Sequence, residues 1–123
     1  MSKTAIIVLS VPKGGEEALG RVFNALAAAY DFSRSGEVAL VFQGAGTRWP
    51  AILTRPDHPA HALYQAVESR VAGASAGCAA VFGSRSEVEQ AGLPLISTNA
   101  VPGTPGLASL AAYAADGYHI LTF

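Results

Sequence analysis

The residue best suited to chemistry is the single cysteine of the chain, Cys78, which lies in a stretch of small residues from 71 to 80. We interpret this stretch as a buried strand that ends at Gly77, so that Cys78 stands where a helix or turn begins. Ligands of open parallel sheets bind beyond the carboxyl ends of the strands. Unpaired N–H groups at such a junction favour the thiolate. The position predicts a nucleophilic or sulfur-carrying thiol, and Arg48 would add positive charge if its loop folds over it.

A second interpretation makes residues 78–82 the strand, because valine and phenylalanine favour sheets more than alanine and glycine do. Cys78 would then lie at the amino end of the strand as a small structural thiol, the commonest fate of a free cysteine. Two features favour the first interpretation. The preceding helix, which ends near Arg70, leaves no room for a loop unless the strand starts at once, and glycines within a strand suit the close approach of another backbone or a ligand.

The same stretch spells G-x-S-x-G at 73–77, the pattern of a hydrolase nucleophile elbow with Ser75 as nucleophile. Asp116 and His119 would complete the triad in the right chain order. However, both are predicted at the opposite edge of the sheet, and the chain is about half the usual size for such hydrolases. Small-residue bias explains the pattern better.

No motif predicts a metal or a cofactor. His58 and His61 are three residues apart, but no cysteine or carboxylate stands beside them at ligand spacing, so we expect solvated histidines at a helix start. Lys13, Gly14 and the following glycine fit no phosphate-binding fingerprint, and two glutamates follow them. A plain strand-to-helix turn is expected there.

Hydrophobic periodicity predicts strands that alternate with helices. Continuous apolar runs, typical of strands buried on both faces, are followed by segments with helical spacing. One such helix has a predicted inward stripe of Leu19, Val22, Phe23, Leu26 and Tyr30, and ends at Ser35–Gly36. Strands are expected at 5–9, 37–42, 71–77, 93–97 and 118–123, and helices from 13, from 59, from 86 and over 104–115.

This order predicts an α/β fold, with three α/β/α layers around a five-stranded parallel sheet. The loops after the first four strands would meet at one edge and form the candidate site. The longest loop, 43–50, holds the only tryptophan beside Arg48, a pair that suits a ligand lid or, slightly better, a subunit contact. The candidate pocket residues are Lys13, Gly14, Gly44, Gly46, Thr47, Arg48, Trp49, Ser75, Gly77, Ser97 and Asn99.

Length and composition indicate one domain spanning residues 1–123. A formal charge of −1 does not indicate a basic surface for nucleic-acid binding. No basic or long apolar segment predicts membrane binding. Half of the residues are hydrophobic and only 14% are charged, so we expect other copies of the chain to cover apolar surface. A lone cysteine and the absence of a signal-peptide pattern favour the cytoplasm.

Four blocks resemble the DsrE-like family of small sulfur-relay proteins: FQGAGTRW at 42–49, GCAAVFG at 77–83, AGLPL at 91–95 and DGYHILTF at 116–123. The resemblance runs in order along nearly the whole chain. It implies a flavodoxin-like α/β/α domain that forms trimers or hexamers. It also implies that Cys78 carries sulfur as a persulfide between a donor and an acceptor protein. The alternative from the residues alone is a small-ligand-binding or assembly module with an inert cysteine.

Overall fold

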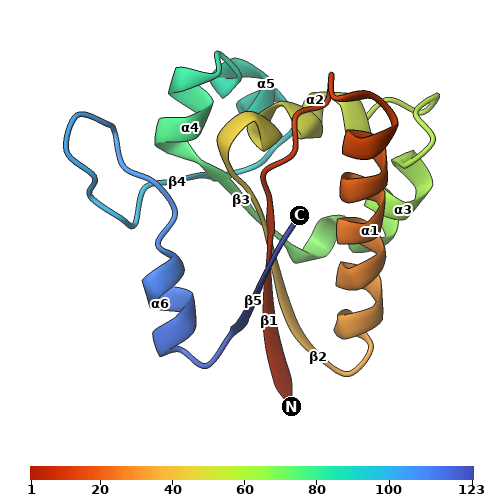
Figure 1. Cartoon of the computed structure of the whole chain (residues 1–123), viewed down its shortest axis with the longest axis horizontal. Helices are drawn as coiled ribbons and strands as arrows, with labels where there is room; N and C mark the ends of the chain where they lie inside the picture. Colours follow the sequence, from red (N-terminus) through yellow and green to blue (C-terminus); the bar gives the residue numbers. More distant parts are fainter.

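Five parallel strands form one sheet in the order β4-β3-β2-β1-β5 in the computed structural model, which describes residues 1–123 (Figure 1). The first four strands follow one another across the sheet, and the last returns to the far side of β1. The predicted α/β fold with a five-stranded parallel sheet is confirmed. The strands are β1 (Ser2–Val8), β2 (Gly36–Phe42), β3 (Val71–Ser75), β4 (Leu95–Ile96) and β5 (His119–Thr122).

The neighbouring strands β1 and β2, inside the sheet, are buried on both faces. All residues of β1 from Thr4 onward are buried, as are the last five of β2. A strand between two neighbours and two covering layers has no side for polar residues, which explains the uninterrupted apolar runs. Leu9, predicted as the last residue of β1, lies beyond it and is 46% exposed.

The two faces of the sheet are covered unequally (Figure 1). Five helices pack on one face around a core of 18 buried residues, whereas the other face holds four buried residues beneath α6 and the chain before it. No residue of α6 is itself buried. The helices are α1 (Gly15–Ser33), α2 (Trp49–Leu53), α3 (His61–Val67), α4 (Ala76–Val81), α5 (Arg85–Gln90) and α6 (Leu110–Ala115). None is long and apolar enough to cross a lipid bilayer.

The inward face of α1 differs from the predicted stripe. Val22 and Leu26 are buried as expected, but Phe23 and Tyr30 are 43% and 45% exposed. Residues 22, 26 and 29 share one face of a 3.6-residue helix, and residues 23 and 30 lie about 100° further round it. The helix also ends at Ser33, and Gly36 is already the first residue of β2.

The predicted loop 43–50 is helical instead. A short 3₁₀ helix, η1 (Gly44–Arg48), runs directly into α2, and Pro50 is accommodated in the first turn of α2, where its missing N–H is harmless. Trp49 is 1% exposed and belongs to the main core. It is therefore neither a ligand lid nor a subunit contact. A second short 3₁₀ helix, η2 (Glu68–Arg70), leads into β3.

The predicted helix 104–115 is confirmed only in its second half. Residues up to Ser109 are irregular, because Gly106 has a φ of +104° and Leu107 pairs with Asn99 through two backbone hydrogen bonds of 2.7 and 2.9 Å. Ser109 then begins α6 as its N-cap, accepting a hydrogen bond from the amide N–H of Ala112. Tertiary pairing thus removes the first half of the expected helix.

Candidate functional site

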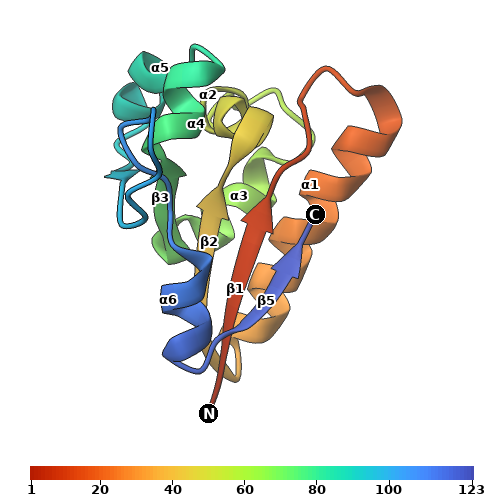
Figure 2. The ribbon, with the colours of Figure 1, turned by 60° about the vertical axis from the view of Figure 1, so that its left-hand side comes forward.

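Cys78 lies at the carboxyl edge of the sheet, as the first interpretation of its stretch predicts. β3 ends at Ser75, and Cys78 is the third residue of α4, which lies beyond the strand tips (Figure 2). Cys78 forms no disulfide, and the residue is partly exposed. The interpretation that made residues 78–82 a strand is wrong, although β3 ends two residues earlier than expected.

The early end of β3 has a specific cause at Gly77. Its amide N–H donates to the carbonyl of Gly106 at 2.7 Å, so the backbone leaves the sheet ladder. A Cβ at Gly77 would lie 2.6 Å from Cδ1 of Leu107 and 3.1 Å from that same carbonyl oxygen. The irregular segment before α6 therefore packs directly on the first turn of α4 and fixes the position of Cys78. Gly77 therefore packs against residues 106–107 and does not line a pocket.

Arg48 approaches α4 from its other end. Its Nε donates to the carbonyl oxygen of Phe82 at 3.1 Å, and its guanidinium lies 5.6 Å from the centre of the Phe82 ring. A cation beside the last carbonyl of a helix is electrostatically favourable. The expectation that Arg48 folds over the thiol is therefore corrected, because it caps the C-terminal end of the helix that carries Cys78.

Several predicted pocket residues are used inside the fold. Thr47 is fully buried, and its hydroxyl donates to the carbonyl of Gly44 at 2.9 Å. The Ser84 hydroxyl lies 2.7 Å from that of Thr47 and so donates to it, which joins η1 to the start of α5. The indole N–H of Trp49 donates to the carbonyl of Ser10 at 2.8 Å. These polar groups hold the loops together and do not face a ligand.

The glycines of η1 allow it to pack on the end of β1. A Cβ at Gly46 would lie 2.2 Å from the carbonyl oxygen of Val8, a distance no side chain tolerates. Gly44 has a φ of +56°, which only glycine adopts readily. Gly44 and Gly46 are therefore required by the backbone geometry of η1 and not by contact with a ligand.

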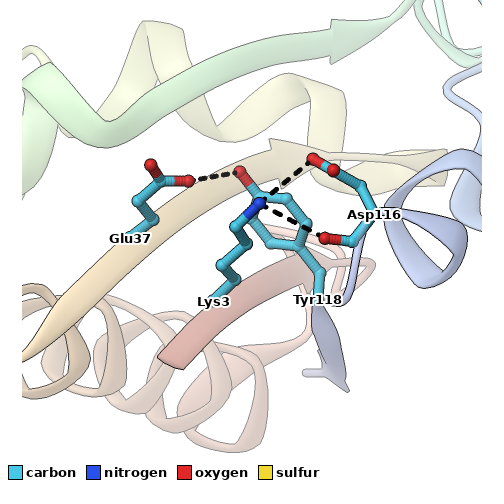
Figure 3. Close-up of polar contacts among 4 residues, drawn as sticks. All are labelled: Lys3, Glu37, Asp116 and Tyr118. Carbon is cyan, nitrogen blue, oxygen red and sulfur yellow. Dashed lines mark hydrogen bonds and ion pairs between the residues drawn. The ribbon is translucent and has the colours of Figure 1, made fainter. Parts of the chain in front are cut away.

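The nominal hydrolase triad does not assemble. Ser75 is buried, and its hydroxyl accepts a hydrogen bond of 3.2 Å from the amide N–H of Ala108. Asp116 instead lies 3.5 Å from the ammonium of Lys3 (Figure 3). His119 is the first residue of β5, so both residues lie at the amino edge of the sheet. The G-x-S-x-G pattern is therefore a small-residue strand end.

The remaining candidates share an edge of the sheet but not a pocket. Gly14 lines a hollow of about 460 Å³ between α1, the loop after β1 and the end of β5. Lys13 and Arg48 line another of about 330 Å³. Ser97 lines a third of about 280 Å³ within the segment 97–106, and Asn99 is fixed by its pairing with Leu107. Cys78 lines none of these three hollows.

The two spaced histidines bond to backbone groups and are not simply solvated. Nδ1 of His58 accepts from the amide N–H of Ala60 at 3.1 Å, and the His58 ring forms a T-shaped contact with the Trp49 ring. Nδ1 of His61 lies 2.8 Å from the carbonyl of Leu53 and donates to it. No group of three or more His, Cys, Asp or Glu side chains is arranged to hold a metal ion.

A polar cluster at the amino edge of the sheet was not anticipated from the sequence (Figure 3). The hydroxyl of Tyr118 donates to Glu37 at 3.2 Å, and the Lys3 ammonium lies 5.5 Å from the Tyr118 ring centre and contacts Asp116. Desolvation, the hydrogen bond to Glu37 and neighbouring negative charge raise the pKa of Tyr118. These residues come from distant segments, so only the strand order brings them together.

Comparison with known proteins supports the fold. No protein-family model matches the chain, and no curated protein is similar to it. A solved structure, a conserved protein of unknown function from Bacteroides thetaiotaomicron, is similar with a TM-score of 0.57. It is 15% identical, and the match covers 97% of this chain and 94% of that one. At this identity the likeness shows a shared α/β fold and nothing about activity.

Proposed function

We propose that the chain is a DsrE-like protein in which the Cys78 thiolate accepts sulfur as a persulfide. One observation carries the proposal: the only cysteine is free, and as a residue partly exposed, in the first turn of the helix that follows β3, at the carboxyl edge of the sheet. This is the edge where open parallel sheets bind ligands. The resemblance of four sequence blocks to the family supports the same residue.

The transfer needs no redox partner. The thiolate of Cys78 attacks the outer sulfur of a persulfide on a donor protein, a new S–S bond forms at Cys78, and the donor's S–S bond breaks. The donor leaves as a thiolate, so electrons and atoms balance. A second exchange of the same kind passes the sulfur to an acceptor protein. A reducing cytoplasm suits this chemistry, since Cys78 has no second cysteine in the chain with which to form an internal disulfide.

The direct test is sulfur loading. After incubation with a cysteine desulfurase and cysteine, intact-protein mass spectrometry should show one added sulfur atom, which dithiothreitol removes. The Cys78→Ser variant should stay unmodified while keeping its circular dichroism spectrum and melting temperature. Loading of Cys78→Ser to the wild-type level would contradict the proposal, because the sulfur would then be elsewhere.

The alternative function is a binding or assembly module in which Cys78 is inert. The observation that favours it is that the thiol lines none of the three hollows of the carboxyl edge. Alkylation by iodoacetamide across pH separates the two functions. A sulfur carrier should react at lower pH than a cysteine peptide does, whereas equal or slower reaction supports the module.

We also propose that the chain self-associates through the exposed side of α1. Phe23 and Tyr30 are seven residues apart on this helix, share one exposed face and leave large apolar side chains in solvent. A trimer or hexamer should be seen by light scattering. Phe23→Glu should shift the mass toward the monomer, whereas Asn24→Glu, which adds the same charged side chain at the exposed neighbouring position, should not. A wild-type monomer would overturn this assembly.

A further inference from the structure

The hollow that Lys13 and Arg48 share collects positive charge from separate parts of the chain. It has a volume of about 330 Å³ and lies between the loop after β1, the η1–α2 segment and α5. Three cations and one carboxylate line it, with apolar side chains between them. Its main lining residues are Lys13, Arg48, Arg55, Glu87, Pro12 and Ile52.

None of the three cations forms an ion pair within the chain. Of its eight lysines and arginines, four form ion pairs, namely Lys3, Arg21, Arg34 and Arg85. Three of the remaining four line this one hollow, and the fourth, Arg70, lies before β3. Glu87 lines the same hollow but lies within 4 Å of none of these cations. The lining therefore carries a net charge of +2 in a chain whose formal charge is −1.

Local helix electrostatics explain only part of this arrangement. Arg48 caps the end of α4, and Arg55 follows the end of α2, where a cation is favourable. Lys13, in contrast, stands two residues before α1, whose amino-terminal end is itself positive. Three like charges around one hollow repel one another unless an anion lies between them.

Arg48 is held ready for such an anion. Its Nε bond to Phe82 and the ring beneath it fix the guanidinium plane, and the side chain is half-buried. Only Nε has a partner in the chain, so both Nη groups remain free to donate. A guanidinium with two free amino groups matches the oxygens of a phosphate.

We propose that this hollow binds the phosphate dianion of a small organic phosphate. The net charge of the lining matches a dianion, Arg48 and Arg55 supply planar donors, and Lys13 supplies a point charge. Pro12 and Ile52 give the organic part an apolar surface. The site is independent of the thiol, because Cys78 does not line it.

The test is a titration followed by amide NMR shifts, with phenyl phosphate and inorganic phosphate as probes and potassium chloride at matched ionic strength as the control. Both phosphates should give saturable shifts around residues 12–13 and 48–55, with phenyl phosphate tighter. The double variant Lys13→Gln/Arg55→Gln, which changes two exposed side chains, should weaken binding about tenfold. Glu87→Gln should tighten it about threefold because a repelling charge is removed.

Arg70→Gln is the matched control, since it removes an unpaired cation outside the hollow, and binding should be unchanged. Equal weakening by Arg70→Gln, shifts no larger than those in potassium chloride, or tighter binding of succinate than of either phosphate would each overturn the proposal. Cys78→Ser should bind phenyl phosphate as the wild type does. Failure of sulfur loading would thus leave this site standing, and failure of phosphate binding would leave the thiol proposal standing.

Discussion

The two ends of the sheet are built differently. At the carboxyl end, polar groups are buried and bonded to one another, as in the Thr47–Ser84 hydroxyl pair and the Trp49 indole that donates to Ser10. At the amino end, contacts are made by exposed side chains: the Lys3 and Asp116 side chains are 35% and 66% exposed (Figure 3). One end is packed like a core, and the other is a solvated surface.

This difference shows where the fold can hold a reactive group still. Buried hydrogen bonds and backbone contacts fix η1, α4 and the segment before α6 relative to the strand tips (Figure 2). Exposed ion pairs restrict little, because water and salt compete with them. Cys78 and the three cations of the hollow, Lys13, Arg48 and Arg55, all lie at this rigid carboxyl end.

Gly46→Ala gives the largest expected effect on the rigid carboxyl end of the sheet. The new Cβ would lie 2.2 Å from the carbonyl oxygen of Val8, so η1 must move off β1. We expect a loss of about 3 kcal/mol in the free energy of unfolding. Gly20→Ala is the control. A Cβ added there would meet no atom within 4 Å beyond its own helix backbone, and alanine favours a helix, so the change should stabilise by up to about 1 kcal/mol. Urea unfolding measures both, and equal effects would contradict the rigid-end account.

A smaller effect is expected from Ser84→Ala. This change removes the buried donor to Thr47 and should lower the free energy of unfolding by about 1–2 kcal/mol. Ser86→Ala, two residues on and exposed, should change it by less than about 0.5 kcal/mol. Similar values for both would mean that the hydroxyl pair does not join η1 to α5.

Tyr64, on α3, tests whether a buried hydroxyl without a hydrogen-bond partner lowers the stability of the protein. Its hydroxyl is buried without a hydrogen bond, and burial, with some help from Glu68, raises its pKa to about 12. Tyr64→Phe should therefore stabilise the protein by about 1 kcal/mol at neutral pH. A destabilised variant in thermal unfolding would show that the hydroxyl has a favourable partner.

The same residue predicts an alkaline loss of stability. The folded pKa of Tyr64, about 12, exceeds its usual value of 10, so above pH 10 the unfolded chain releases the proton first. Stability should be fully present below pH 10 and fall as the pH rises toward 12. Tyr64→Phe should make the fall shallower in urea titrations at each pH. An unchanged slope would place the cause in the raised pKa values of Tyr113 and Tyr118.

The smallest effect is expected at the amino end. Lys3→Gln removes the ion pair with Asp116 and the cation over Tyr118, and should cost less than about 0.5 kcal/mol, with the difference vanishing in 1 M salt. A loss as large as that of Ser84→Ala would show that both ends are equally rigid.

The sequence predicts the sheet well, because β1 and β2 are buried apolar runs and the Gly73–Gly77 stretch places the strand-to-helix junction within two residues of where it lies. It fails where tertiary contacts override local patterns. Trp49 suggests an exposed loop residue but begins α2 and is buried in the main core, and Leu107 has helical spacing but pairs with Asn99.

The site was predicted as one pocket because the loops share an edge of the sheet. The candidate residues are divided among several hollows because of how their side chains pack, for example the Thr47 hydroxyl bonding to Ser84. The spacing of residues in the sequence does not reveal such packing. The cluster around Arg55 was missed for a similar reason. Arg55 and Glu87 meet Lys13 only through the folding of η1 and α2, although the absence of an acidic residue three or four positions from Arg55 is visible in the chain.

The central claim is that Cys78 is a working thiol on a rigid edge. Intact-protein mass spectrometry after incubation with a cysteine desulfurase and cysteine tests it most directly. The account predicts one added sulfur on the wild type, located on the Cys78 peptide and absent from Cys78→Ser. A wild-type protein that stays unmodified while a known sulfur acceptor in the same reaction is loaded would contradict it.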